Sequence, residues 1–240
     1  MKMNILAMFS HPDDVEAMCG GTLIKYKKQG HRIYIGLTTS GDQGSNEHGT
    51  REEIAAIREK EQLAAAKFYD AEVRFLRFHD QRLFDTEEVR IAVLDTMRWA
   101  NPDVIFTNWP YDPSVDHRIT GQMVADLMLS LPGKLLPANE TPVMKATSLF
   151  FADTDTNSAE FIPEVYVDIT NEMDEKIEAF ACHLSQLAWV RCSGSLKDYD
   201  FGKMPRILNA FRGLQAGFNY AEGFRAFRIQ GYMPDFSLLP

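Results

Sequence analysis

The sequence predicts an α/β protein built around a mostly parallel β-sheet. Short apolar runs, typical of buried strands, alternate with longer stretches in which apolar residues recur at helical spacing. The composition agrees, because 45% hydrophobic and 25% charged residues in a chain of 240 are ordinary for a globular protein with a sizeable core. Ligands of such sheets bind beyond the C-terminal strand ends, so functional residues are expected in the loops after strands.

The chain begins with a strand, a helix and a second strand. Asn4–Phe9 is a short apolar run that predicts a buried strand. Gly20–Lys28 has helical composition and stops at Gly30, and Arg32–Thr38 predicts the second strand. The polar segment Ser40–Gly49 contains several glycines and is expected to form the loop that follows this strand.

The same alternation continues through the next fifty residues. Apolar residues recur at helical spacing between 54 and 68, and Val73–Leu76 is a short strand candidate. Asp85, with Glu88 three positions later, is expected to cap a helix that ends before Pro102.

A fourth strand is predicted at Asp103–Asn108, and Thr120 is expected to cap the helix after it. The proline-containing stretch Pro132–Pro142 then breaks the pattern, before two further strand candidates at Thr147–Phe151 and Val165–Ile169.

The last part of the chain is less regular. Asn171 is expected to cap a helix whose apolar positions run from Met173 to Leu187. Residues 191–240 are rich in Gly, Phe and Arg, and we expect loops and short helices there.

The net charge of −9 makes nucleic acid and a polybasic membrane patch poor candidates for partners. No run of about 18 apolar residues exists, so no membrane insertion is expected. The apolar stretch Ile5–Phe9 is too short for a signal-peptide core. Cys19, Cys182 and Cys192 lie far apart without paired spacing, which favours reduced thiols in the cytoplasm.

The segment HPDDVE, residues 11–16, directly follows the first predicted strand. His11 and Asp14 are three positions apart, so one turn stiffened by Pro12 can direct both side chains at one point, and both are ligand types that zinc accepts. Asp13 lies between them and points elsewhere. A carboxylate beside a metal, without binding it, is a natural base for water that the metal activates.

A catalytic zinc needs a third protein ligand, and His117 in the loop after the fourth predicted strand is the candidate. Asp112 and Asp116 are expected to orient it. A lone His-x-x-Asp is more often a helix cap or a surface pair, but both segments follow strands, which favours a metal site. Two histidines and one carboxylate also suit iron or cobalt, so the residues alone leave the metal open.

Several segments together resemble the PIG-L/LmbE-like family of zinc deacetylases, in chain order over about residues 3–187. They are HPDDVE at 11–16, TSGDQGS at 39–45, IREKEQLAAA at 57–66, HDQRL at 79–83, VDHRITG at 115–121 and KIEAFACHLSQ at 176–186. The resemblance implies a Rossmann-like three-layer sandwich, the LmbE-like fold, as one domain over 1–240 with a C-terminal extension at 188–240. It also implies removal of an N-acetyl group from an amino sugar or a GlcNAc-containing glycoconjugate.

The resemblance also implies roles for individual residues. One Zn²⁺ per chain is expected on His11, Asp14 and His117. Asp13 is implied as the general base, and Asp116 and His183 are further expected catalytic residues. Arg58, Asp80 and Ser114 are expected to contact the substrate, with Arg51 as a competing choice for Arg58.

One position departs from the family. Its second motif reads His-Pro-Asp-His, and the first His helps to stabilise the oxyanion, whereas this chain has Ser114 there. Loss of an oxyanion donor typically costs about 10²–10³ in turnover. His183, Tyr111 and Arg191 are candidates for a substitute.

This departure keeps two alternatives open: a zinc amidase for a larger acyl or thiol conjugate, and a catalytically weak carbohydrate-binding relative. A nucleotide-binding Rossmann protein is disfavoured, because the loop after the first strand lacks the glycine fingerprint. A homo-oligomer with a small amino-sugar substrate is expected.

Overall fold

The computed structural model describes residues 2–44, 49–154, 160–192, 201–230 and 233–240. Within these ranges seven strands form one sheet in the order β3-β2-β1-β4-β5-β7-β6. The strands are β1 (Asn4–Phe9), β2 (Arg32–Thr39), β3 (Glu72–Phe78), β4 (Val104–Thr107), β5 (Ser148–Ala152), β6 (Val165–Asp168) and β7 (Ala221–Ala226). The pairs from β3 to β5 are parallel, and β7 runs antiparallel to both of its neighbours. The predicted α/β fold with a mostly parallel sheet is confirmed.

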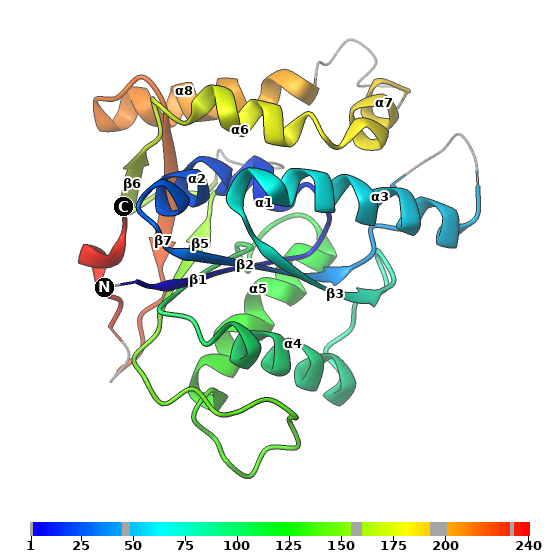
Figure 1. Ribbon diagram of the computed structural model, residues 1–240, viewed down its shortest axis with the longest axis vertical. Coiled ribbons are helices and arrows are strands. Elements are labelled where there is room, and N and C mark those ends of the chain that lie inside the picture. The colour runs from blue at the N-terminus through cyan, green and yellow to red at the C-terminus, as the bar shows by residue number, and fades with distance from the viewer. Residues whose placement is uncertain (1, 45–48, 155–159, 193–200, 231–232) are drawn as a thin grey trace.

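Helices cover both faces of the sheet (Figure 1). On one face lie α4 (Glu87–Ala100) and α5 (Val115–Leu127), and on the other lie α1 (Asp14–Met18), α2 (Gly20–Lys28) and α3 (Arg51–Ala65). Further out on that second side are α6 (Met173–Phe180), α7 (Leu184–Cys192) and α8 (Met204–Ala216). Short 3-10 turns lie at Ala66–Tyr69, Met128–Ser130, Phe201–Lys203 and Phe236–Leu238.

The central strand β1 explains the two cores. Ile5, Ala7 and Phe9 point into the cluster beneath α1 and α2, whereas Leu6 and Met8 point into the cluster beneath α4 and α5. A strand covered on both faces can be apolar at every position, and the continuous run at Asn4–Phe9 predicts this burial.

Three expected helix starts are corrected by the structure. Thr86, rather than Asp85, caps α4, because its side chain accepts from the Val89 amide while Asp85 pairs with Arg90. Helix α5 already begins after Ser114, and Thr120 is a buried residue inside it whose hydroxyl hydrogen-bonds to Thr38.

The third correction concerns the C-terminal helices. Glu172 precedes the first residue of α6, so Asn171 is not the cap. The predicted single helix up to Leu187 is divided into α6 and α7 at residues 181–183.

The C-terminal fifty residues contribute more than loops and short helices. Helix α8 has 13 residues, and β7 is inserted between β5 and β6. Strand β7 contains the fully buried Glu222, whose carboxylate accepts from the Gly21 and Thr22 amides and pairs with Lys176 Nζ at 2.6 Å. A buried carboxylate that is paired and hydrogen-bonded in this way avoids the large free-energy cost of an unpaired buried charge.

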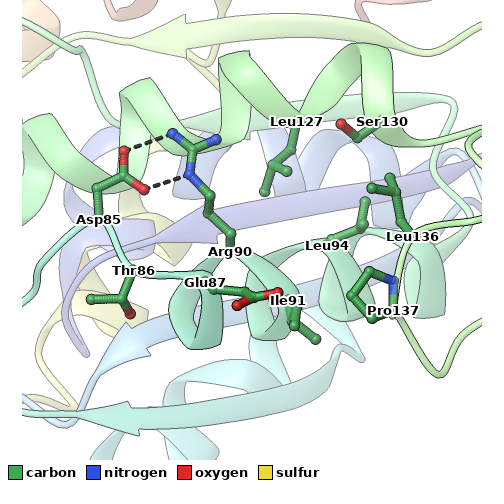
Figure 2. A pocket seen from close by; sticks show the side chains of 10 residues that line it. All are labelled: Asp85, Thr86, Glu87, Arg90, Ile91, Leu94, Leu127, Ser130, Leu136 and Pro137. Atoms are coloured by element: carbon green, nitrogen blue, oxygen red, sulfur yellow. Dashed lines mark hydrogen bonds and ion pairs between the residues drawn. The ribbon is translucent and has the colours of Figure 1, made fainter.

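A cavity of about 330 Å³ opens between α4, α5 and residues 130–137 (Figure 2). Its walls are mostly apolar, and the Arg90 guanidinium at its rim is paired with both oxygens of Asp85. None of the helices in the described ranges is long and apolar enough to span a bilayer.

Candidate metal centre

The predicted ligands come from the loops after two neighbouring strands. His11 follows β1, Asp14 is the first residue of α1, and His117 lies in the first turn of α5 beyond β4. Strands β1 and β4 are adjacent and parallel, with Ile5 opposite Val104, so their C-terminal ends lie side by side. The topology therefore brings together residues that are more than 100 positions apart in sequence.

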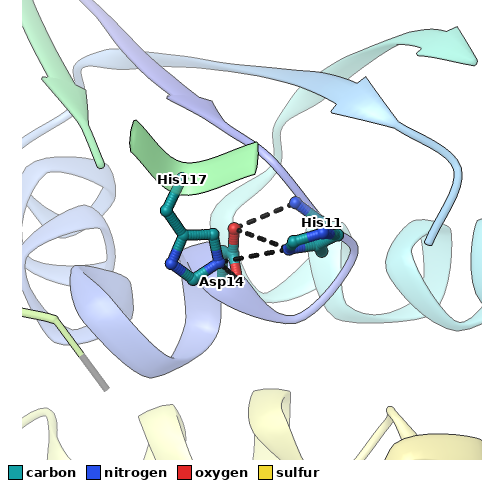
Figure 3. Close-up of side chains that lie close together, drawn as sticks. All are labelled: His11, Asp14 and His117. Carbon is teal, nitrogen blue, oxygen red and sulfur yellow. Dashed lines mark hydrogen bonds and ion pairs between the residues drawn. The ribbon is translucent and has the colours of Figure 1, made fainter. Parts of the chain in front are cut away.

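The three side chains converge with the spacing that a metal ion requires (Figure 3). His11 Nδ1 lies 3.1 Å from His117 Nε2, which lies 3.3 Å from Asp14 Oδ1, and Asp14 Oδ2 lies 3.6 Å from His11 Nδ1. Ligand atoms about 2.0–2.1 Å from a tetrahedral ion lie about 3.3–3.4 Å from one another. Two imidazole nitrogens and a carboxylate thus fit one divalent ion.

The opposite nitrogen of His11 is held by two carboxylates. His11 Nε2 lies 3.2 Å from Asp80 Oδ1 and 3.2 Å from Asp116 Oδ2, and the Gln81 amide donates to the same Asp116 oxygen. Such contacts fix the tautomer and ring orientation of a ligating histidine. Asp116 was expected to orient His117, but the structure places it, together with Asp80, against His11.

His117 is oriented in the same way by Asp112. The Asp112 Oδ1 atom lies 3.2 Å from His117 Nδ1 and accepts a 2.7 Å hydrogen bond from the Ser114 amide. The other Asp112 oxygen accepts from the Thr154 hydroxyl, beyond the end of β5. Ser114 occupies the N-cap position of α5, and its side chain makes no capping bond.

The charged groups of this cluster shift one another's pKa values. Burial alone would lower the pKa of His117, but Asp14 and Asp112 outweigh it and raise this pKa to about 10. Burial would also lower the pKa of His11, but the nearby carboxylates, chiefly Asp14, raise it well above its ordinary value. Burial would raise the pKa of Asp14, but the two histidines hold it well below its usual range. The cluster therefore holds protons that a cation must displace.

Asp13 is not among the side chains that converge in the metal cluster, and it has a strained backbone. Its φ of 114° lies in the left-handed region, which is unusual for a residue other than glycine. Arg58 Nη2 donates to Asp13 Oδ1 at 3.1 Å and also to the Pro12 carbonyl, and the Asp13 amide donates to Gln62 Oε1. Burial raises the pKa of the Asp13 carboxyl, and the Arg58 charge opposes this rise.

A buried network connects this turn to the C-terminal helices. Glu16 Oε1 accepts from Gln62 Nε2 at 3.0 Å, and Glu16 Oε2 lies 3.1 Å from His183 Nε2. All three side chains are completely buried. Burial would lower the pKa of His183, but Glu16 outweighs it and raises this pKa, so a charged His183 is stabilised near Asp13.

The remaining expected site residues contact residues other than the three proposed ligands. Arg58 is buried and is engaged by Asp13, Pro12 and the Gly41 carbonyl, whereas Arg51 pairs with Asp42. Tyr111 packs on Trp109, with ring centroids 5.2 Å apart. The side chain of Arg191 lies outside the described residues.

Four polar residues of the site were not among the expected site residues: Asp42, Gln62, Asn108 and Thr154. An oxygen of Asp42 accepts a hydrogen bond from the Asp80 amide. Asn108 Nδ2 donates to Asp14 Oδ2 at 3.4 Å, and the Ser10 amide donates to the same oxygen. Asp42, Asn108 and Thr154 all follow strands, so their position at the C-terminal edge of the sheet was the available clue.

Two deacetylases are among the known proteins to which this chain is similar. A 29% identical relative from Bacillus anthracis is a probable N-acetyl-alpha-D-glucosaminyl L-malate deacetylase 2, and the match covers 77% of this chain and 82% of the relative. The structure of an N,N'-diacetylchitobiose deacetylase from Pyrococcus horikoshii is 26% identical with a TM-score of 0.80, covering 93% of this chain and 83% of that one.

A third similarity shows that the fold serves more than one reaction. The 4-carboxy-2-hydroxymuconate hydratase from Pseudomonas putida superposes with a TM-score of 0.81 at 20% identity, covering 95% of this chain and 97% of that one. The reaction must therefore be argued from the site rather than from the fold. The family described as GlcNAc-PI de-N-acetylase matches residues 6–128, which is half of the chain, and the chain therefore belongs to the PIG-L family.

Proposed function

We propose that this protein is a zinc-dependent N-deacetylase of an acetylated amino sugar. The observation that carries the proposal is the convergence of His11, Asp14 and His117, with Asp13 directly before Asp14 in the same turn. Deacetylases of GlcNAc-containing substrates among the relatives support it. The two nitrogens and one carboxylate suit zinc, and the identity of the ion is part of the proposal.

The reaction adds water across an amide: a C–O bond forms at the acetyl carbon, the C–N bond breaks, and acetate and a free amine leave. A divalent ion bound by His11, Asp14 and His117 would polarise the carbonyl and make water more acidic. Asp13 is assigned to accept the proton of the attacking water and to return it to the departing amine. Arg58 holds one oxygen of this carboxylate, and burial raises its pKa, so Asp13 can hold a proton during the reaction.

His183 is the residue we assign to the developing negative charge in place of the family histidine replaced by Ser114. It is fully buried, and its Nδ1 has no hydrogen-bond partner within the part of the chain that the structure describes. Its charge is close enough to lower the pKa of Asp13, and Glu16 holds its other nitrogen. A fixed, charged donor in a water-poor site stabilises an oxyanion without reorganising.

Acetate release tests the proposal directly. The purified protein, loaded with zinc, is incubated with GlcNAc, N,N'-diacetylchitobiose and GlcNAc-malate, and free acetate and free amine are both measured. We expect equal amounts of acetate and amine from at least one substrate, and loss of both with Asp13→Asn. Release from N-butyryl or longer acyl analogues alone would favour the amidase alternative. Sugar binding without release of any acid would favour the carbohydrate-binding alternative.

A further inference from the structure

The backbone of Asp13 differs from that of an ordinary helix cap. Asp13 is the N-cap residue of α1, and its carbonyl oxygen accepts from the Ala17 amide. An aspartate at this position usually has an extended backbone, and its carboxylate accepts from amides of its own helix. Here φ is 114°, the side chain makes no capping bond, and Arg58 holds one carboxylate oxygen instead. With this φ the carboxylate is left free of its own helix.

Two side chains of α3 hold the peptide unit that determines this φ. The angle φ describes rotation about the N–Cα bond of Asp13, so it changes when the peptide plane between Pro12 and Asp13 turns. Arg58 Nη2 donates to the carbonyl oxygen of this peptide, and Gln62 Oε1 accepts from its amide at 3.3 Å. Arg58 and Gln62 are four positions apart and therefore lie on one face of α3. Rotation of the peptide plane would break both contacts.

Glu16 fixes the orientation of the Gln62 side-chain amide. Gln62 Nε2 donates to Glu16 Oε1 at 3.0 Å, and both side chains are completely buried. An ionised carboxylate only accepts hydrogen bonds, so it selects the NH₂ group of Gln62 and leaves the Gln62 oxygen to face the Asp13 amide. The other oxygen of Glu16 lies 3.1 Å from His183 Nε2. A buried chain of hydrogen bonds therefore runs from His183 through Glu16 and Gln62 to the strained peptide.

The positive φ of Asp13 depends on these contacts. A residue other than glycine persists in the left-handed region only where its surroundings impose that conformation. Without the Gln62 oxygen, the Asp13 amide loses its acceptor and one of the two contacts that hold the peptide plane. The backbone can then relax to the extended conformation of an ordinary N-cap, in which the carboxylate of Asp13 is occupied by amides of α1.

We propose that Gln62 is a positioning residue for Asp13: oriented by Glu16, it keeps Asp13 at positive φ and so keeps the Asp13 carboxylate free to act as the base. This inference rests on the proposed function, which assigns the proton transfer to Asp13. A displacement of about 1 Å can cost a catalytic group roughly 10²-fold in rate. The hydrogen bonds of Gln62 go to Asp13 and Glu16, so zinc binding by the three proposed ligands should not depend on it.

Kinetics of Gln62→Met test the effect on the reaction. Asn209→Leu is the matched control, because Asn209 is also a buried amide, and it donates to the Ala221 carbonyl. Acetate release from GlcNAc, N,N'-diacetylchitobiose and GlcNAc-malate is measured with the zinc-loaded proteins. Gln62→Met should lower kcat about 10–100-fold while KM and the zinc content stay at the wild-type values. Asn209→Leu should leave kcat unchanged, and an equal loss in both variants overturns the proposal. Gln62→Leu carries the same expectation and replaces Gln62→Met if thermal unfolding shows that Gln62→Met does not fold.

NMR of the labelled, zinc-loaded proteins reads the backbone of Asp13 without the reaction. The Cα and Cβ chemical shifts of Asp13 report its φ, and exchange of its amide with D₂O reports its hydrogen bond. In Gln62→Met we expect shifts typical of an extended backbone and amide exchange about tenfold faster or more, whereas Asn209→Leu changes neither. Unchanged shifts and exchange at Asp13 in Gln62→Met overturn the positioning role, whatever happens to kcat. Changed shifts without any effect on acetate release, or in a wild type that releases none, keep the positioning role and contradict only the proposed function.

Discussion

Replacing Asp112 by Asn tests whether the metal cluster depends on the carboxylate behind His117. Asp112 is buried, lies 3.2 Å from His117 Nδ1 and accepts from the Ser114 amide and the Thr154 hydroxyl. An amide of the same shape keeps one acceptor oxygen but removes the negative charge. His117 then loses the partner that fixes its tautomer and strengthens it as a ligand.

The expected size of the effect follows from the role of this contact. Losing the partner of a ligating histidine typically costs about 10–100-fold in metal affinity. This corresponds to about 1.4–2.8 kcal/mol of binding free energy. His117→Ala removes a ligand outright and should cost more than Asp112→Asn. The ranking of the two variants is therefore part of the prediction.

The assay is a zinc competition titration against a chromophoric chelator at pH 7. Asp126→Asn is the matched control, because Asp126 lies in the same helix α5 but pairs at the surface with Arg90. Thermal unfolding of the metal-free proteins checks that the variants remain folded. A zinc affinity for Asp112→Asn within twofold of the wild type, in a folded protein, would refute the argument.

Three other outcomes follow from the same geometry. Asp13→Asn should reduce kcat by about 10²–10⁴ while zinc content stays at the wild-type level, and an active variant would remove Asp13 from the base role. Ser114→His should raise kcat about tenfold or more, because it adds a hydrogen-bond donor for the oxyanion. An unchanged or lower kcat would contradict this expectation. Glu16 raises the pKa of His183 in the folded state. Protonation of His183 therefore stabilises the folded protein at pH values below the ordinary pKa of 6.5. This stabilisation is lost as the pH rises through the pKa of His183 in the folded protein. In urea titrations His183→Gln should therefore cost more unfolding free energy at pH 6 than at pH 9, and an equal cost at both would argue against a charged His183.

The convergence of His11, Asp14 and His117 could be predicted from the sequence because it depends on local rules. His11 and Asp14 lie in one turn, and His117 follows a strand that pairs in parallel with the strand before His11. Parallel strands present their C-terminal ends at one edge, so chain order and strand type are enough to bring these residues together.

The contacts behind the ligands depend on information that one sequence does not contain. The Thr154 hydroxyl reaches Asp112 because β5 lies next to β4, and Asp80 reaches His11 because β3 ends on the same edge. Strand order and loop course decide these pairings, and neither is encoded in a local pattern. Asp80 and Arg58 lie against His11 and Asp13, and their contact with substrate stays a prediction.

Strand β7 is difficult to recognise from the sequence because it contains a buried charged residue. Its sequence, AEGFRA, contains Glu222, Gly223 and Arg225 and lacks the apolar alternation of a strand. Glu222 is nevertheless buried, because Lys176 and two amides at the start of α2 satisfy its carboxylate. Those partners are distant in sequence, so the strand could only be recognised from the three-dimensional structure.

Metal analysis of the purified protein tests the central claim most directly. Wild-type protein and the His117→Ala variant are stripped with a chelator, reconstituted with zinc, desalted and analysed for bound metal per chain. The account predicts about one zinc ion per wild-type chain and a large loss of zinc in His117→Ala. A wild-type protein that is folded but retains no metal after reconstitution, or a His117→Ala variant that retains it in full, would contradict the assignment of His11, Asp14 and His117 as a metal centre.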